Sequence, residues 1–211
     1  MASDGFLQLV EQRRSNYTLS AESTIPDAKV VEIVQAAIKW APASYNVQSA
    51  RAVVLFRDQH RQFWDLAATH IAAHVKNLPL DEATKAFLVG RMAGFKAAYG
   101  TVLWFEDQAA LDGLAKLHAN VVPLLKEFSD SSSGMHQFIV WTALTAEGLG
   151  ASLQHINSVP TLPAETLSTF GLPETWVFKA QLVFGKPTAP PMDKMTPPLG
   201  LPLETRVLVK E

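Results

Sequence analysis

The chain of 211 residues contains no cysteine. This absence excludes disulfides, thiolate nucleophiles, iron–sulfur clusters and cysteine-ligated zinc. Six histidines are present, but they form no HExxH pattern, and the pair His70 and His74, one helical turn apart, has no identifiable third ligand. We therefore expect no metal site, and any redox chemistry would require an organic cofactor.

The chain also lacks a strong excess of charge of either sign, with 18 Lys and Arg against 20 Asp and Glu. No stretch is strongly basic, so we expect neither nucleic acid nor an anionic membrane surface as a partner. A small-molecule ligand is the better expectation. The motifs GxSxG, GxxxxGK[ST] and GxGxxG are absent, which argues against hydrolase, P-loop and Rossmann-type sites.

Long hydrophobic runs are missing as well. The most apolar stretch, residues 86–105, is interrupted by Arg91 and Lys96 and is not expected to span a bilayer. The N-terminus carries Asp4 and Glu11 and has no basic region leading into an apolar run, so no secretory signal is predicted. These features favour a cytoplasmic protein.

The composition indicates one globular domain over residues 1–211, because 48% of the residues are hydrophobic and 18% are charged. Apolar periodicity predicts helices, and short β-branched or aromatic runs predict strands. The predicted helices cover residues 6–14, 26–41, 59–74, 81–98 and 134–147, and the predicted strands cover residues 51–56, 101–105, 176–184 and 205–209. Repeated prolines make residues 186–202 extended, so residues 186–211 are expected to form an arm across a surface. The expected fold class is α+β with helices dominant.

A first polar motif follows the first predicted helix, where Arg13, Arg14 and Ser15 precede Asn16 and Tyr17. A guanidinium is a rigid, permanently charged fork suited to phosphate, and a serine hydroxyl or a backbone N–H can complete the contact. The alternative is an ordinary helix end, where solvated arginines are favoured by the helix dipole. The pentapeptide alone does not decide between them.

A second polar segment, residues 42–49, joins the second predicted helix to the first predicted strand. The side chains of Ser44, Asn46 and Gln48 can donate and accept hydrogen bonds. Such a set suits a heteroaromatic ring with alternating N–H, N and C=O groups. An ordinary turn is the alternative, because proline, serine and asparagine are standard turn residues.

A third segment, residues 147–150, ends the long predicted helix with Glu-Gly-Leu-Gly. These glycines allow a left-handed helix cap or a close approach of the backbone to a ligand. His155 is a candidate base or ligand, although a lone histidine is also typical of a hydrogen-bonded structural residue. Lys194 and Arg206 are isolated cations near the end of the arm, where surface charges are equally ordinary.

Four motifs, taken in order along the chain, resemble the FMN-dependent nitroreductase family. They are Arg-Arg-Ser near the N-terminus, Pro-x-Ser-x-Asn-x-Gln before the first strand, Glu-Gly-Leu-Gly late in the chain, and Gly-Lys-Pro before a final Lys and Arg. Strings such as Gln48-Ser49-Ala50-Arg51 and Ala151-Ser152-Leu153-Gln154-His155 are most similar to the branch that includes the Frm2-like (fatty-acid repression mutant type) nitroreductases. The resemblance covers essentially the whole chain.

The resemblance implies a nitroreductase-like fold, with a central, mostly antiparallel sheet flanked by helices. It also implies a homodimer in which the C-terminal arms are exchanged, with one FMN at each of two sites built from both subunits. Arg13 and Ser15 would hold the phosphate together with Lys194 and Arg206. The segment whose backbone N–H would approach flavin N5 comprises Leu153, Gln154 and His155.

From the other subunit, the flavin ring would be lined by Pro42, Ala43, Ser44, Asn46 and Gln48. Arg14 and Tyr17 complete the set of candidate cofactor-binding residues. Where the wider family often has a lysine or arginine near flavin N1, this chain has Tyr17, as in the Frm2-like branch. Phe128 stands where that branch often has a tryptophan, which bears on the acceptor pocket.

The activity implied by the resemblance is reduction of nitroaromatic or quinone-like acceptors by an NAD(P)H oxidoreductase. NADH or NADPH would give a hydride to FMN and leave before the acceptor binds, which is a ping-pong mechanism. No catalytic side chain is expected, because the flavin carries the chemistry. The alternative, motivated by Tyr17, is a flavin-binding sensor or interaction protein with little or no turnover.

Overall fold

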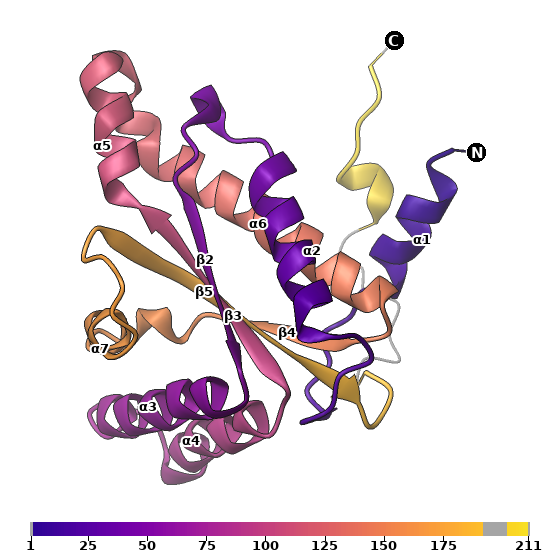
Figure 1. Ribbon diagram of the computed structural model, residues 1–211, viewed down its shortest axis with the longest axis vertical. Coiled ribbons are helices and arrows are strands. Elements are labelled where there is room, and N and C mark those ends of the chain that lie inside the picture. The colour runs from indigo at the N-terminus through magenta and orange to yellow at the C-terminus, as the bar shows by residue number, and fades with distance from the viewer. Residues whose placement is uncertain (1, 192–201, 211) are drawn as a thin grey trace.

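The computed structural model describes residues 2–191 and 202–210, in which helices cover both faces of a five-stranded sheet (Figure 1). The strands are β1 Leu19–Ser20, β2 Ala50–Phe56, β3 Gly100–Asp107, β4 Gly150–Gln154 and β5 Trp176–Pro187. The helices are α1 Asp4–Gln12, α2 Asp27–Trp40, α3 Arg57–Val75, α4 Glu82–Lys96, α5 Gln108–Leu117, α6 Leu125–Ala146 and α7 Leu162–Thr169. All strand pairs are antiparallel in the order β1-β5-β3-β2, and β4 pairs with β5. The predicted α+β fold, with a mostly antiparallel sheet flanked by helices, is confirmed.

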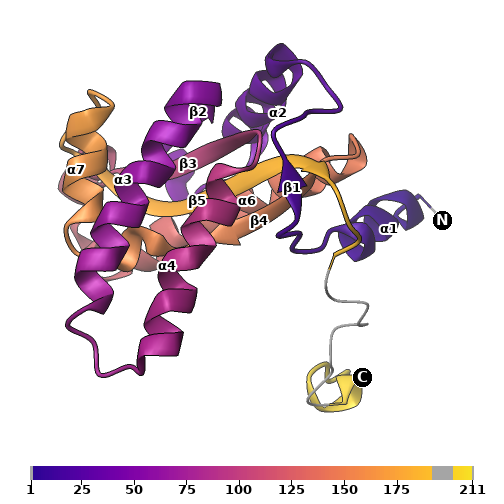
Figure 2. The same ribbon diagram turned by 90° about the horizontal axis from the view of Figure 1, so that it is seen from below.

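Strand β3 is buried on both faces, which explains its continuous apolar sequence. Val102 and Trp104 pack in one core cluster with α2 and α6. Leu103 and Phe105 pack in a second cluster with α3, α4 and α7 on the opposite face. Figure 1 shows the two helical layers on either side of the sheet, and in Figure 2, seen from below, α3 and α4 lie in front of the strands.

The long strand β5 contains a bulge opposite the middle of β3. Trp104 pairs with Ala180 and Phe105 pairs with Phe178, so Lys179 is the extra residue. As a result Phe178 belongs to the core cluster on the α3 side, whereas Ala180, two residues later, belongs to the cluster on the α6 side. Lys179 Nζ lies 2.8 Å from a carboxylate oxygen of Asp130 on α6.

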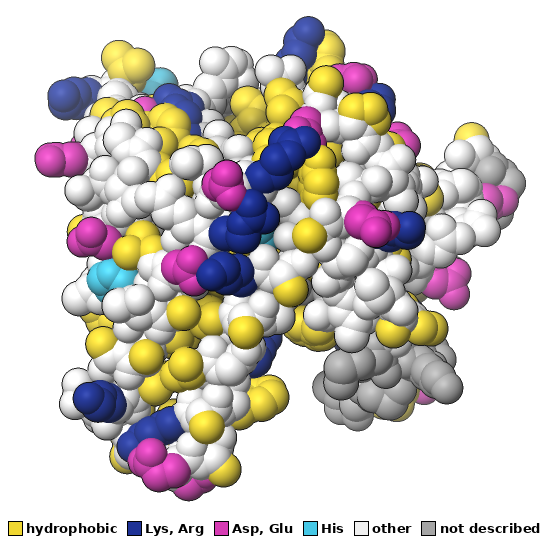
Figure 3. Space-filling model, turned by 60° about the horizontal axis from the view of Figure 1, so that its bottom comes forward, with side chains coloured by type: hydrophobic (Ala, Val, Ile, Leu, Met, Phe, Trp, Pro, Cys, Tyr) yellow, Lys and Arg dark blue, Asp and Glu magenta, His cyan; other side chains and the backbone are white. Residues whose placement is uncertain are grey.

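Charged side chains of α3 and α4 form ion pairs with each other and with the start of α2. Lys96 pairs with Asp65 at 2.6 Å, and Arg57 pairs with Asp27 at 2.5 Å. Figure 3 shows basic and acidic groups intermixed with hydrophobic patches on this side of the molecule. Among the helices of the described residues, none has both the length and the apolar character needed to cross a membrane.

A buried hydrogen-bond network joins α3 to β3. The Trp64 indole N–H donates to the Thr101 hydroxyl at 2.9 Å, so this hydroxyl is free to donate its own proton to His60 Nδ1, also at 2.9 Å. The other ring nitrogen, Nε2, then donates to the Lys96 carbonyl at 3.2 Å. These contacts suit a neutral His60, and burial lowers its pKa to about 4.

Acid should therefore destabilise the protein between about pH 6.5 and pH 4. The unfolded chain takes up a proton at His60 in this window and the folded chain does not, so stability falls as pH falls, by up to about 3 kcal/mol. Urea unfolding at a series of pH values measures this loss. The variant His60→Leu should be less stable at neutral pH but should lose less stability across the window. An equally steep loss in His60→Leu would contradict the assignment.

The structure corrects several boundaries predicted from the sequence. The helix predicted at 134–147 begins at Leu125, because a serine-rich stretch hid its first turns. Elements α5, α7, β1 and β4 were not predicted. Strand β5 continues to Pro187, so the predicted arm begins at residue 188 and not at residue 186. Within the described chain, residues 205–209 do not form the predicted strand: residues 203–205 form a 3₁₀ turn, and Val207, Leu208 and Val209 are exposed. Pairing of this run with a partner subunit stays a prediction.

Candidate cofactor site

The N-terminal motif runs beside β4. Ser15 forms a parallel bridge with Ala151, and the Asn16 N–H donates to the Ala151 carbonyl at 2.9 Å. Because Ala151 lies in the same strand as Leu153 and Gln154, the structure brings together two segments that are far apart in the sequence. Residues 13–17 and 153–155 therefore form one half of a candidate site.

Arg13 is a partly buried cation without a counter-charge among the described residues. Its guanidinium carbon lies 4.3 Å above the centre of the Trp141 ring of α6, and its Nε has no hydrogen-bond partner. Burial, and then the adjacent Arg14, lower the pKa of Arg13. An anion bound here would relieve both effects, which favours the phosphate role over an ordinary helix end.

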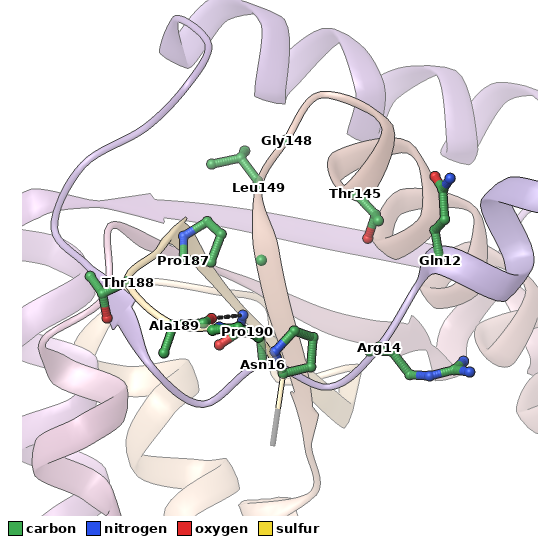
Figure 4. Close-up of a pocket in the computed structure, with 12 residues that line it drawn as sticks. Gln12, Arg14, Asn16, Thr145, Gly148, Leu149, Pro187, Thr188, Ala189 and Pro190 are labelled. Atoms are coloured by element: carbon green, nitrogen blue, oxygen red, sulfur yellow. Dashed lines mark hydrogen bonds between the residues drawn. The ribbon is translucent and has the colours of Figure 1, made fainter. Parts of the chain in front are cut away.

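Arg14 borders a different cavity, of about 450 Å³, between the end of α1 and the residues that follow β5. The Asn16 amide donates to the Ala189 carbonyl at 3.1 Å and ties this wall to the N-terminal motif (Figure 4). In Figure 4 the Arg14 side chain extends away from the other lining residues, and its Nη1 donates to the Arg13 carbonyl at 3.3 Å. Arg14 therefore lies at the edge of this cavity with its guanidinium directed outward, and its role stays a prediction.

Arg91 of α4 is a candidate site residue that the sequence did not indicate. Its guanidinium carbon lies 5.7 Å from the centre of the Tyr17 ring, and its Nη2 donates to Gln154 Oε1 at 3.1 Å. Tyr17, Phe87 and Arg91 line a cavity of about 450 Å³ at this point. The sequence signal that could have identified Arg91 is its charge within the apolar stretch 86–105. That charge was interpreted only as evidence against a membrane-spanning helix.

The loop at residues 42–48 adopts an unusual backbone. Tyr45, Asn46 and Gln48 have positive φ angles of 55°, 48° and 51°, which side-chain-bearing residues rarely adopt outside functional or tightly held positions. Ala43, Asn46 and Gln48 line a cavity of about 350 Å³ that also borders Ser132 and His136 of α6. Ser44, together with Tyr45 and Asn46, forms a single 3₁₀ turn.

The loop and the N-terminal motif line different cavities. Pro42 borders an apolar cavity with Phe6 and Leu9 of α1, whereas Tyr17 and Arg91 line the cavity beside α4. The site predicted from the sequence is thus divided into two groups within one chain. His155 lies exposed just after β4, Arg206 is exposed after the 3₁₀ turn, and Lys194 lies outside the described residues.

Comparisons with known proteins identify the family of the chain. A model of the nitroreductase family matches residues 10–186. Two proteins of Saccharomyces cerevisiae, HBN1 and the nitroreductase FRM2, are 34% and 31% identical, each over 90% of this chain and 91% of its own length. The solved nitroreductase CinD from Lactococcus lactis in complex with chloramphenicol is 32% identical, with a TM-score of 0.83 over 98% of this chain and 100% of CinD.

A more distant structure shows the same fold. The FMN-dependent nitroreductase NfnB from Mycobacterium smegmatis, solved with NADPH, is 12% identical with a TM-score of 0.65 over 89% of this chain and 90% of NfnB. The family match, the fold and the ordered motifs agree. The chain therefore belongs to the nitroreductase family of oxidoreductases, in the branch of yeast HBN1 and FRM2.

Proposed function

We propose that the protein is an FMN-dependent NAD(P)H oxidoreductase that reduces nitroaromatic or quinone-like acceptors by a ping-pong mechanism. The observation that carries this proposal is the half-site formed by Arg13, Ser15 and β4, where a cation with no counter-charge in the described part of the chain lies beside a strand. CinD, the relative described above, has been solved with chloramphenicol and with 4-nitrophenol, which supports nitroaromatic acceptors for this chain.

The donors present fit FMN. Arg13 Nε and Gln154 Nε2 are buried and have no hydrogen-bond partner among the described residues, so both can donate to a ligand. Arg13 and Ser15 would hold the phosphate, with Lys194 and Arg206 supplied by the arm. Arg91 and Tyr17 would lie toward the flavin ring, and positive charge there favours the anionic form of a reduced ring.

A homodimer would join the two groups of residues. The chain exposes large apolar side chains on α1 and α6, including Phe6 at 58% and Leu7 at 57%, with Met135 and Ile139 also exposed. Such a surface is typical of an interface. In a dimer, the partner's loop would complete the ring site, and the exposed run 207–209 could pair with the partner's sheet as an exchanged arm.

FMN, when bound, supplies the redox chemistry by taking a hydride at N5 from NADH or NADPH and passing reducing equivalents to the acceptor. The protein's contribution is to hold the phosphate, orient the ring and place positive charge near it. Because donor and acceptor would use the same cavity, the oxidised nucleotide must leave before the acceptor binds. This order gives ping-pong kinetics.

The alternative, a flavin-binding sensor without turnover, depended on the missing cation at position 17. Arg91 supplies a guanidinium 5.7 Å from the Tyr17 ring, so the site does not lack positive charge. The enzymatic proposal is therefore the better supported of the two.

Anaerobic mixing of the FMN-loaded protein with NADH or NADPH, each in turn, tests the function. We expect at least one nucleotide to bleach the visible flavin absorbance, and a nitroaromatic or quinone added afterwards to restore it. Retained flavin that neither nucleotide bleaches would support the sensor instead. A protein that takes up no FMN would overturn both.

A further inference from the structure

The strained loop at residues 43–48 is held by buried contacts from its C-terminal side. Ser49, which follows the loop, is fully buried, and its hydroxyl lies 2.5 Å from Glu106 Oε2 on β3. The Ser49 carbonyl accepts from the Asp107 N–H at 2.8 Å. The end of the loop is therefore anchored to β3 by both its side chain and its backbone.

Arg51 adds a second anchor. Its Nη1 donates to the Gln48 carbonyl at 2.8 Å, and its Nη2 pairs with Asp107 at 2.9 Å. Gln48 is one of the residues with positive φ. Backbone strain of this kind persists only where surrounding contacts outweigh it, and these contacts are made by residues on β2 and β3.

Glu106 is an unusual anchor because it is a carboxyl in the protein interior. It is 1% exposed, and its second oxygen, Oε1, has no hydrogen-bond partner among the described residues. Burial raises its pKa, while the bond to Ser49 and the charges of Lys179 and Arg51 oppose this rise. A leucine or phenylalanine would fill such a place at lower desolvation cost, so the carboxyl needs a specific reason to be there.

We propose that Glu106 is a positioning residue that acts through Ser49 to hold the 43–48 loop in the conformation that lines the flavin ring. Its hydrogen bond to Ser49 lies one residue from Gln48 and three from Asn46, both of which border the 350 Å³ cavity. A preformed loop lowers the conformational cost of binding a ligand. The ligand part of this proposal rests on the proposed function, but the control of the loop does not.

Hydrogen exchange of the FMN-free protein tests the loop directly. We expect Ser49→Ala and Glu106→Ala to accelerate exchange in peptides covering residues 43–49 by about 10-fold, since one buried hydrogen bond is lost. Glu106→Gln keeps an acceptor for the Ser49 hydroxyl, so exchange in this variant should stay as slow as in the wild-type protein. Thr166→Val is the matched control, because it removes a buried hydroxyl from α7 on the opposite face of the sheet.

FMN titration by fluorescence and the visible circular dichroism of bound flavin provide the second readout. Ser49→Ala should weaken FMN about 10-fold and change the dichroism of the bound ring, whereas Glu106→Gln and Thr166→Val should do neither. Thr166→Val is expected to lower only the melting temperature. If the two alanine variants also lower the melting temperature without changing loop exchange or flavin binding, Glu106 is a core residue and the proposal is wrong. If the wild-type protein binds no FMN, the proposed function fails, and the exchange experiment still decides the role of Glu106.

Discussion

Replacing Arg13 with alanine should weaken FMN binding by about 10- to 100-fold, measured by flavin fluorescence titration. A charge-assisted hydrogen bond contributes roughly 1.5–3 kcal/mol, and the Arg13 guanidinium is already held over Trp141 with an unused donor. The site therefore gives up little conformational entropy when an anion binds. The protein should still fold, because Arg13 forms no ion pair among the described residues and the lost stacking on Trp141 costs only about 0.5–2 kcal/mol.

The adjacent arginine supplies a control of equal charge. Arg14→Ala removes the same net charge only one position away, but Arg14 borders the cavity at the end of β5. Its effect on FMN affinity should stay below about threefold if affinity depends on the direct contact rather than on net charge. Equal losses in the two variants, or no loss in Arg13→Ala, would refute the phosphate assignment to Arg13.

Replacing Gly185 with alanine should destabilise the fold by about 3 kcal/mol or more, which lowers the melting temperature by about 6–12 °C. A Cβ atom at this position would lie 2.5 Å from the Ser20 carbonyl oxygen and 3.1 Å from the Tyr99 nitrogen. Both are backbone atoms, so no side-chain rotation relieves the clash. Strand β1 would have to separate from the end of β5.

Gly113→Ala is the matched control for this prediction. An added Cβ at Gly113 meets nothing within 4 Å, and the residue lies inside α5. Alanine should leave stability unchanged or raise it by roughly 0.5–1 kcal/mol, because it favours the helix. Thermal unfolding of both variants measures the difference, and a Gly185→Ala protein as stable as Gly113→Ala would show that β1 can move.

Sequence patterns were reliable where one element has one clear periodicity. Helix α2 was predicted at 26–41 and observed at Asp27–Trp40, since Pro26 and Pro42 mark its two ends. Helix α6 was only half predicted, because its buried face carries Ser129, Ser132 and Ser133 where a core stripe would normally be apolar. The periodicity of apolar residues identifies only hydrophobic helix faces. A helix turn whose buried face is polar therefore resembles an exposed helix or a loop in the sequence.

The candidate site was predicted in its parts but not in its assembly. The sequence indicated residues 13–17 and 153–155 separately, and only the Ser15–Ala151 bridge shows that they lie side by side. Arg91 could not be connected to Tyr17, because a contact between α4 and the N-terminal segment leaves no local pattern. The flavin roles of all these residues stay predictions.

Because of the bulge at Lys179, the packing of the start of β5 depends on the number of residues in this strand. Removing one residue there would restore strict alternation, and residues 176–178 would all turn to the opposite face of the sheet. Phe178 would leave its stack with Phe105, and the ion pair between Lys179 and Asp130 would be lost. Homologous chains should therefore conserve the number of residues between Trp176 and Phe184 even where the amino acid at the bulge differs.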